Sequence, residues 1–383
     1  MARDDLWIDS GRALDTLCAR LQGAEWLALD TEFMRERTYY PQLCLVQIAT
    51  PDVIACVDVL AITELEPLLA RLQDPHTLKV LHAARQDLEM FFHLSGEVPA
   101  PLFDTQIAAS FAGFPDQAGY ATVVQGLLGV SLGKAHTRAD WTRRPLPEAV
   151  RDYAADDVRY LCKLYPLLRE RLASDGRLTW LEVENQKLTR VSLYRPDPEH
   201  AWERLHGLQH LKPRQLAAGK ALAAWRERKA MEANLPRQWV LKDEALMDLS
   251  KQRPATLEAL ANVRGLAEAS VRKHGAEWLA LIQAAVPASE APVHVTRLSA
   301  HQEAAVDALL ALVHLKAAEA GISPARLTTR AELEQLVAGD RDIGILEGWR
   351  LETAGRALRE MLEGKTALAI DAQALTVISR GAQ

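Results

Sequence analysis

The sequence predicts an α/β domain with a mixed sheet, followed by two smaller domains built only of helices. Apolar runs of strand length alternate with helical periodicity over roughly the first half of the chain. Strand-like runs then disappear, and residues 213–285 and 300–362 have the period and composition of helices. The chain of 383 residues is also too long for one ordinary core, so two or three domains are expected.

The elements of the first domain follow from local sequence signals. Residues 25–33 form an apolar run that predicts a buried strand, and Pro51-Asp52 separates two further β-rich runs as a turn does. Pro145 and Pro147 precede a long helical pattern, as is common at helix N-termini. We expect strands at residues 25–33, 43–50, 53–59 and 78–83, and helices at residues 62–73, 84–94 and 147–173.

Two segments are interpreted as linkers between domains. Residues 192–207 contain Pro196 and Pro198 and show no clear period, and residues 286–297 also contain prolines. The expected domains therefore span residues 1–195, 208–288 and 295–375.

The two helical domains are similar to each other in sequence. Residues 224–233 align with residues 311–320 at an offset of 87. Alanine-rich helices also match by chance, but shared apolar spacing across a predicted turn favours duplication. The same offset aligns Leu235 with Ile322, Val240 with Leu327, Leu246 with Leu333, and Leu249 with Leu336.

Charge is distributed unevenly along the chain. The net charge is −6, and residues 1–200, 201–288 and 289–383 carry −8, +5 and −3. A basic segment between two acidic ones suggests a local surface for nucleic acid. Trp225 lies in this segment at an apolar helical position and is expected in the core. The candidate RNA-contacting residues of the segment are Lys212, Arg214, Lys220, Arg226, Arg228 and Lys229.

Composition excludes several classes of protein. No run of about eighteen apolar residues is present, so no membrane span is expected. The N-terminus lacks the basic and apolar regions of a secretory signal. The four cysteines form no C-x-x-C pair, which indicates reduced, buried thiols rather than a zinc or redox site. We therefore expect a cytoplasmic protein.

Carboxylates occur where a metal site can form in the first domain. Asp30-Thr31-Glu32 ends the first strand, and residues two apart on a strand face the same side. Burying unpaired carboxylates is costly, and a divalent cation offsets that cost. Asp87 follows the strand at residues 78–83. Each signal alone is weak, because a strand that simply reaches solvent, or a carboxylate in the first turn of a helix, is the more usual explanation.

The predicted long helix carries a third acidic position. Tyr153 and Asp157 are four residues apart and share one helix face, whereas Asp156 points about 100° away. Such a pair is usually structural. The combination of all these positions, in this order along the chain, is much more specific than any one of them.

This order resembles the proofreading-type exonucleases with four carboxylates and a tyrosine, and in particular the ribonuclease D family. One departure is Val150, where many relatives carry Gln. Residues 208–288 resemble the helicase-and-ribonuclease-D C-terminal (HRDC) module, and the offset-87 partner resembles a diverged, more acidic copy. The motifs that carry the resemblance are LDTEF at residues 29–33, KVLHA at 79–83, FDTQ at 103–106, DWTRRPL at 140–146 and YAADDV at 153–158.

The resemblance implies a ribonuclease H-like exonuclease domain followed by two HRDC-like domains. It implies removal of 3′ mononucleotides from precursors of tRNA and other structured RNAs, and we expect a monomer. Asp30, Glu32, Asp87 and Asp157 would bind two divalent cations, Mg²⁺ or Mn²⁺, because all-oxygen ligation suits these hard ions. Tyr153 is a poor general base, since an unperturbed phenol titrates near about pH 10, and is expected to hold the attacking water.

Further residues near these motifs are candidates for substrate contact. Phe33 and Met34 are placed to stack on the terminal base or sugar, although Phe33 also fits a core position. Basic residues before the long helix can meet phosphates or form a solvated face. His82 is either a site residue or a satisfied, partly buried histidine. The expected substrate-contacting residues are Thr31, Phe33, Met34, His82, Lys134, Arg143 and Arg144.

Two alternative functions stay open from sequence. A DNA exonuclease of the same superfamily would use identical metal chemistry, and discrimination rests on contacts to the 2′-OH. HRDC-like modules also occur in DNA helicases. The other alternative is a nucleic-acid-binding scaffold with an inactive nuclease domain, against which the presence of all four carboxylates and the tyrosine argues.

Overall fold

The protein forms two compact units in a computed structural model, which describes residues 5–133, 139–287, 298–371 and 374–380. One unit comprises Met1–Thr31, Leu45–Arg190 and Thr296–Gln383, and the other comprises Glu32–Cys44 and Val191–Val295. The second unit therefore combines the first helical segment with a short piece of the predicted α/β domain.

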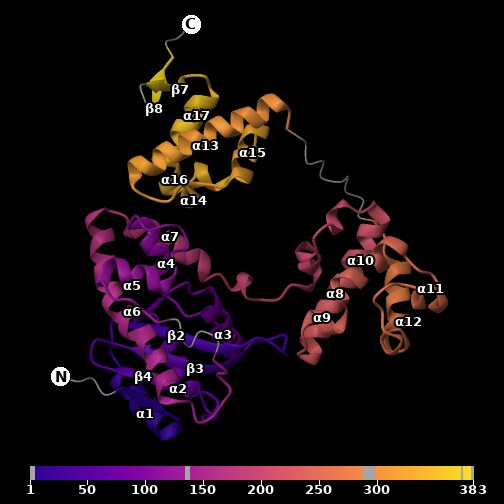
Figure 1. Ribbon diagram of the computed structural model, residues 1–383, viewed down its shortest axis with the longest axis horizontal. Coiled ribbons are helices and arrows are strands. Elements are labelled where there is room, and N and C mark those ends of the chain that lie inside the picture. The colour runs from indigo at the N-terminus through magenta and orange to yellow at the C-terminus, as the bar shows by residue number, and fades with distance from the viewer. Residues whose placement is uncertain (1–4, 134–138, 288–297, 372–373, 381–383) are drawn as a thin grey trace. The chain divides into compact units, whose positions relative to one another are not determined.

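A six-stranded mixed sheet forms the centre of the α/β domain (Figure 1). Its strand order is β1-β4-β3-β2-β5-β6, so β2 lies in the interior. Strand β5 is parallel to both β2 and β6, whereas β3 and β4 are antiparallel, which confirms the expected mixed sheet. The strands are β1 (Leu6–Ile8), β2 (Trp26–Met34), β3 (Gln42–Ala49), β4 (Ile54–Val57), β5 (Leu78–Leu81) and β6 (Leu102–Asp104).

Helices pack on this sheet through apolar faces. Helix α6 contacts β4 and β5, and its residues Val158, Leu161 and Leu168 are buried. Strands β1 and β6 were not expected, because three residues are too few to show an alternating pattern. The helices are α1 (Gly11–Arg20), α2 (Glu66–Gln73), α3 (Arg85–Ser95), α4 (Thr105–Phe111), α5 (Tyr120–Leu128), α6 (Glu148–Ser174) and α7 (Leu178–Leu188).

The first helical segment has its own core in the second unit. Helix α8 packs against α10 and α12 (Figure 1), and the rings of Trp225 and Trp278 meet edge to face at 5.6 Å. The expected core position of Trp225 is confirmed. The elements are η1 (Val191–Leu193), η2 (Pro198–Arg204), η3 (Leu208–His210), α8 (Pro213–Ala233), α9 (Arg237–Val240), α10 (Asp243–Gln252), α11 (Leu257–Ala261) and α12 (Glu268–Ala284).

Part of the predicted linker at residues 192–207 is ordered structure. Pro198–Arg204 forms a 3₁₀ helix that Asp197 caps through the Glu199 amide at 2.9 Å. Leu205 is 4% exposed and belongs to the core around Trp225. The linker interpretation was wrong there because two prolines interrupt any α-helical period without preventing a short 3₁₀ turn.

The second helical segment repeats the first in structure as well as in sequence. Helices α8 and α13 begin and end 87 residues apart, and so do α9 and α14. Buried Leu246 and Leu249 of α10 correspond to buried Leu333 and Leu336 of α15. These matching bounds support duplication. The elements are α13 (Ala300–Ala320), α14 (Pro324–Leu327), α15 (Arg330–Ala338), η4 (Gly344–Leu346), α16 (Gly348–Arg350), the π-helical turn η5 (Leu351–Gly355) and α17 (Arg356–Leu362).

A β-hairpin that was not expected follows α17 (Figure 1). Strands β7 (Thr366–Asp371) and β8 (Ala374–Ser379) pair antiparallel. Thr366, Thr376 and Val377 are β-branched residues that favour strands. The domain expected at residues 295–375, which was predicted to be built only of helices, therefore also contains strands.

The second helical segment docks on the α/β domain within the first unit. Trp349 stacks on Trp180 with ring centroids 4.8 Å apart and an interplanar angle of 13°. Arg350 forms a 2.7 Å ion pair with Glu184, whose side chain is 9% exposed. Surface of the second repeat is thus used for contacts inside the chain.

The cysteines agree with the expectation of reduced thiols. None of the four, all of which lie in the described part of the chain, forms a disulfide, and Cys44, Cys56 and Cys162 are buried. Burial raises the pKa of Cys56 to about 12, so this thiol is protonated at neutral pH. Across the described residues, no helix has both the length and the apolar character needed to cross a membrane.

Candidate active site

Strand β2 places Asp30 and Glu32 on one side of the sheet. The strand is interior, and its residues Leu27–Leu29 are buried apolar side chains, so the two carboxylates emerge where the apolar run ends. One carboxylate oxygen from each of Asp30, Glu32 and Asp157 lies within 4.8 Å of the other two. The sequence prediction that these three residues gather is therefore met by the geometry.

Helix α6 supplies Asp157 to this group. Its neighbours Ala155 and Val158 are buried and hold the helix against the domain. Asp156 is turned away and forms an ion pair with Arg159 instead. Adjacent residues of a helix point in different directions, and Asp157 therefore faces the acidic group while Asp156 does not.

Asp87 is not part of this group of three. Its side chain is 7% exposed in the first turn of α3, and its Oδ1 accepts a 2.5 Å hydrogen bond from the hydroxyl of Thr31. Burial raises the pKa of Asp87 to about 7, against the opposing effect of the Thr31 hydrogen bond. Thr31 sits between the two carboxylates of β2, so Asp87 is tied directly to the acidic strand.

Asp104 holds the turn that leads into α3. Its carboxylate accepts the backbone N–H of Ala83 at 3.2 Å and of Ala84 at 2.9 Å, and it caps α4 by accepting from Gln106 at 2.8 Å. Ala83 has a φ of 57°, a left-handed conformation that costs energy for a non-glycine residue. Asp104 thereby stabilises the strained turn that places Asp87, a function that the FDTQ motif alone did not reveal.

Tyr120 is a residue near the site that sequence analysis missed. Its hydroxyl donates to the main-chain carbonyl of Asp157. Burial raises the pKa of Tyr120 well above its usual value, and the charges of Asp157 and Asp30 raise it further. Burial likewise raises the pKa of Asp157 to about 7. No local signal marks Tyr120, because its partner lies 37 residues away on another helix.

Tyr153 lies one turn before Asp157 on α6 and is half-buried. Val150, one turn earlier still, is buried and serves packing. The phenol of Tyr153 is therefore on the same helix face as the site carboxylate, as the i, i+4 spacing predicted.

Three of the expected substrate-contacting residues have their polar atoms engaged within the protein, and Thr31 is the first, through the bond from its hydroxyl to Asp87. The Nε2 of His82 lies 3.1 Å from the Ala118 carbonyl and its Nδ1 lies 3.0 Å from the Thr105 hydroxyl. Arg144 forms a bidentate pair with Asp58, with both N–O distances 2.6 Å.

The other expected substrate contacts are less constrained. Arg143 is exposed, and Phe33 and Met34 are half-buried at the end of β2. Lys134 lies outside the described residues. For all seven positions, contact with substrate stays a prediction.

The basic residues of the first helical segment fall into two groups. Arg226 is 4% exposed and pairs with Asp243 at 2.5 Å, so it is a core residue rather than a surface cation. Three more of the six cations expected from sequence have partners: Arg228 pairs with Glu199 at 2.6 Å, Lys229 pairs with Glu232 at 3.6 Å, and Lys220 lies 4.1 Å from the centroid of the Trp202 ring.

The second group surrounds a cavity of about 610 Å³ at the start of α8. Lys212 and Arg214 line it together with Lys251 and Arg253, which were not singled out from the sequence. Within the part of the chain that the structure describes, no carboxylate pairs with these four side chains. They converge only because the end of α10 folds back beside the start of α8.

The mixed sheet with its gathered carboxylates defines a nuclease of the 3′–5′ exonuclease class. The family described as 3′-5′ exonuclease matches residues 6–173, and the HRDC domain family matches residues 215–282. The chain belongs to the ribonuclease D family and is a hydrolytic 3′→5′ exoribonuclease.

Similarity to members of this family extends over nearly the whole chain. Ribonuclease D of Acidiphilium cryptum is 42% identical over 379 residues, which cover 97% of this chain and 96% of the relative. Ribonuclease D of Granulibacter bethesdensis is 39% identical over 382 residues, with coverages of 98% and 96%. The crystal structure of Escherichia coli RNase D matches with a TM-score of 0.84 and 35% identity over 94% of this chain and 99% of that chain.

Proposed function

We propose that this enzyme removes 5′-mononucleotides from RNA 3′ ends with two divalent cations held by Asp30, Glu32, Asp87 and Asp157. The convergence of oxygens from three of these residues within 4.8 Å carries the proposal. Asp87 joins them through Thr31, which separates the two acidic residues of β2. Like charges at this spacing repel one another, and divalent cations would remove that repulsion.

The donor set fits Mg²⁺ or Mn²⁺. Every candidate ligand atom is a carboxylate oxygen, and no histidine or cysteine belongs to the group of three. Two bound cations would make a water acidic enough to attack and would stabilise the leaving oxygen of the phosphodiester. The protein's part would be to position the carboxylates from β2, α3 and α6, and the bound cations would favour their ionised form against the effect of burial.

Tyr153 is proposed to orient the attacking water by a hydrogen bond. Its position one turn before Asp157 places the phenol on the face of α6 that carries the site carboxylate. A phenol at its ordinary pKa is a poor base near neutral pH, so it directs the water rather than deprotonating it.

The substrate is proposed to be structured RNA, including tRNA precursors. The Escherichia coli relative is described as an exoribonuclease involved in structured RNA processing. Phe33 and Met34 would contact the terminal nucleotide, and exposed Arg143 would contact phosphate. We further propose that the protein is cytoplasmic and monomeric.

RNA backbone is proposed to bind at the cavity formed by Lys212, Arg214, Lys251 and Arg253. Four cations around one cavity, for which the described residues supply no carboxylate partner, offer several donors to phosphate oxygens at once. This position differs from the six basic residues expected from sequence, of which Arg226 is buried in the core. Contacts here would hold a long RNA while its 3′ end is trimmed.

The decisive experiment compares Asp157→Asn with Asp156→Asn in the full-length protein. Both changes remove one adjacent carboxylate charge from α6, but only Asp157 belongs to the acidic group. Each protein would be incubated with 5′-labelled single-stranded RNA or matched DNA, with Mg²⁺ or with EDTA. We expect a metal-dependent ladder that shortens from the 3′ end of RNA, abolished only by Asp157→Asn.

Other outcomes would change the assignment. Equal loss of activity in both variants would contradict the assignment of Asp157 to a metal site. Equal or faster cutting of DNA would favour the DNA exonuclease, and binding of RNA without cutting by the wild-type protein would favour the scaffold.

A further inference from the structure

The connection that follows the acidic strand is packed with the HRDC domain. Strands β2 and β3 are joined by residues 35–41, which begin three positions after Glu32. The whole segment Glu32–Cys44 belongs to the same compact unit as Val191–Val295. A proposed metal ligand therefore lies at the start of a segment that the helical module holds.

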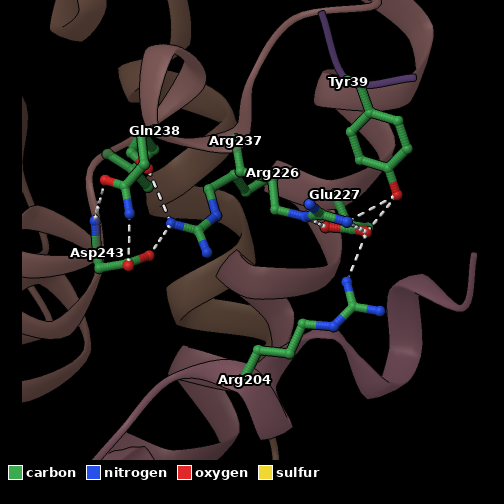
Figure 2. Close-up of polar contacts among 8 residues, drawn as sticks. Tyr39, Arg204, Arg226, Glu227, Arg237, Gln238 and Asp243 are labelled. Atoms are coloured by element: carbon green, nitrogen blue, oxygen red, sulfur yellow. Dashed lines mark hydrogen bonds and ion pairs between the residues drawn. The ribbon is translucent and has the colours of Figure 1, made fainter. Parts of the chain in front are cut away.

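The contact centres on a buried carboxylate of the HRDC domain. Glu227 of α8 is 1% exposed, and its Oε1 accepts a 2.5 Å hydrogen bond from the Tyr39 hydroxyl (Figure 2). Arg237 of α9 forms a bidentate pair with the same carboxylate at 2.6 and 2.7 Å. Arg204 reaches it at 3.3 Å. Tyr39 and the two arginines thus share one buried carboxylate.

Two further contacts fix the direction of the connection. The Arg237 guanidinium lies over the Tyr39 ring, 4.5 Å from its centroid, and donates to the Tyr39 hydroxyl at 3.0 Å. The amide of Tyr40 donates to the side chain of Asn234 at 3.1 Å. Asn234 ends α8 in a left-handed conformation with a φ of 48°. The HRDC domain therefore holds the connection at two points, the ring of Tyr39 and the main-chain amide of Tyr40.

Electrostatics make this contact specific. Burial alone would raise the pKa of Glu227, but hydrogen bonds from Arg237 and Tyr39 outweigh it and hold the pKa below its usual value. Burial and the bond to Glu227 raise the pKa of Tyr39, so its phenol remains the donor. Removing one partner of a buried charge is costly, so the connection has one strongly preferred docked position.

We propose that Tyr39 is a positioning residue through which the HRDC domain sets the place of Glu32 in the metal site. The inference rests on the proposed function of Glu32 as a metal ligand. Tyr39 follows Glu32 by seven positions, and the last three residues of β2, which begin with Glu32, link the ligand to this connection. With Tyr39 released, Glu32 would sample more positions and would bind a cation less well, because residues that orient metal ligands typically contribute about 10–100-fold to affinity.

Metal binding and activity would be measured separately in the full-length protein. Isothermal titration with Mn²⁺ would be performed on the wild type and on Tyr39→Ala, Tyr39→Phe and Glu32→Gln. We expect Tyr39→Ala to raise the Kd for Mn²⁺ on the order of tenfold, and Tyr39→Phe to raise it less because the ring over Arg237 remains. Arg37→Ala is the matched control, since Arg37 is an exposed residue of the same connection.

Kinetics distinguish positioning from RNA binding. At subsaturating Mn²⁺, Tyr39→Ala should lower kcat by a similar factor on a dinucleotide and on a long single-stranded RNA. At high Mn²⁺, kcat should return towards the wild-type value on both substrates. A rise in KM restricted to the long RNA, with Mn²⁺ affinity unchanged, would mean that the contact serves RNA binding and would overturn the proposal.

Failure of this inference can be separated from failure of the metal site. If Glu32→Gln weakens Mn²⁺ binding and folded Tyr39→Ala and Tyr39→Phe do not, the positioning function is wrong and the metal site stands. If Glu32→Gln leaves Mn²⁺ binding unchanged, the proposed ligand set itself is wrong. If the Tm of Tyr39→Ala lies below the assay temperature, that variant is unfolded in the assay. The Mn²⁺ affinity of the milder Tyr39→Phe variant then decides whether Tyr39 positions Glu32.

Discussion

The hydroxyl of Thr31 donates a 2.5 Å hydrogen bond to the carboxylate of Asp87, and both side chains are buried. This bond joins the interior strand β2 to the first turn of α3. It ties Asp87 to the strand that carries two of the three gathered carboxylates. A hydrogen bond to an ionised group is worth about 1.5–3 kcal/mol, so Thr31 helps to keep Asp87 in its charged form.

Thr31→Val should therefore weaken metal binding without a change at any proposed ligand. Valine has nearly the same shape as threonine but no donor, so the pKa of Asp87 would rise further. We expect the Kd for Mn²⁺ to increase about tenfold, which corresponds to the loss of a bond to a charged group. Titration calorimetry checks this, and Thr31→Ser, which keeps the hydroxyl, should behave like the wild type. An increase in KM for RNA alone would instead support a substrate contact by Thr31.

Stability without metal should fall as pH rises between about 4 and 7. Burial raises the pKa of Asp87 and Asp157 to about 7 in the folded protein. The unfolded chain ionises the same groups near about pH 4, so the folded state binds more protons in this interval and loses stability with rising pH. Divalent cations bind the ionised form and should restore stability above the interval.

Thermal unfolding with EDTA or with Mg²⁺ tests this expectation. The increase in Tm on adding Mg²⁺ should be larger at about pH 8 than at about pH 6. Asp157→Asn should reduce the difference between the Tm increases at the two pH values, because it removes one of the two carboxyl groups whose pKa is raised. An equal increase at both pH values would contradict the assignment of these carboxylates to the metal site.

Asp104→Ala should reduce both stability and metal affinity. The change removes the acceptor for Ala83, Ala84 and the α4 cap. We expect a loss of about 2–4 kcal/mol in the free energy of unfolding, from a lost helix cap and unsatisfied amides. Asp104→Asn keeps one acceptor oxygen and should lose less. Urea unfolding and Mn²⁺ titration of both variants give the measurement, and a stability loss with unchanged Mn²⁺ affinity would argue against a link between this turn and Asp87.

Neutral substitutions around the cavity of the HRDC domain should reduce the salt dependence of RNA binding. Lys251→Ala removes an unpaired cation, so the slope of log Kobs against log salt should decrease by about 0.7. Lys229→Ala is the matched control, because it removes the same charge from a residue that already pairs with Glu232. Fluorescence anisotropy of labelled RNA at several salt concentrations provides the measurement. Equal slopes for the two variants would mean that net charge, and not the cavity, attracts RNA.

Much of the fold and the centre of the site could be predicted from sequence because their signals are local. Alternation along a strand places Asp30 and Glu32 on one side, and the helical period separates Asp157 from Asp156. The offset of 87 reappears in the bounds of α8 and α13. In each case, the periodicity of the backbone alone decides which way a side chain points.

Local periodicity does not reveal which distant residue a side chain will meet, and this limit explains what the sequence left open. The sequence predicted that Arg226 is a surface cation, whereas the packing of α8 against α10 buries Arg226 beside Asp243. It showed no reason for Tyr39, whose partner Glu227 lies 188 residues later. The sequence by itself determined the domain classes, the repeat and the acidic residues on β2 and α6. Only the tertiary structure decided which groups pair, because burial removes water and leaves a polar group to the partners that packing brings within hydrogen-bonding distance.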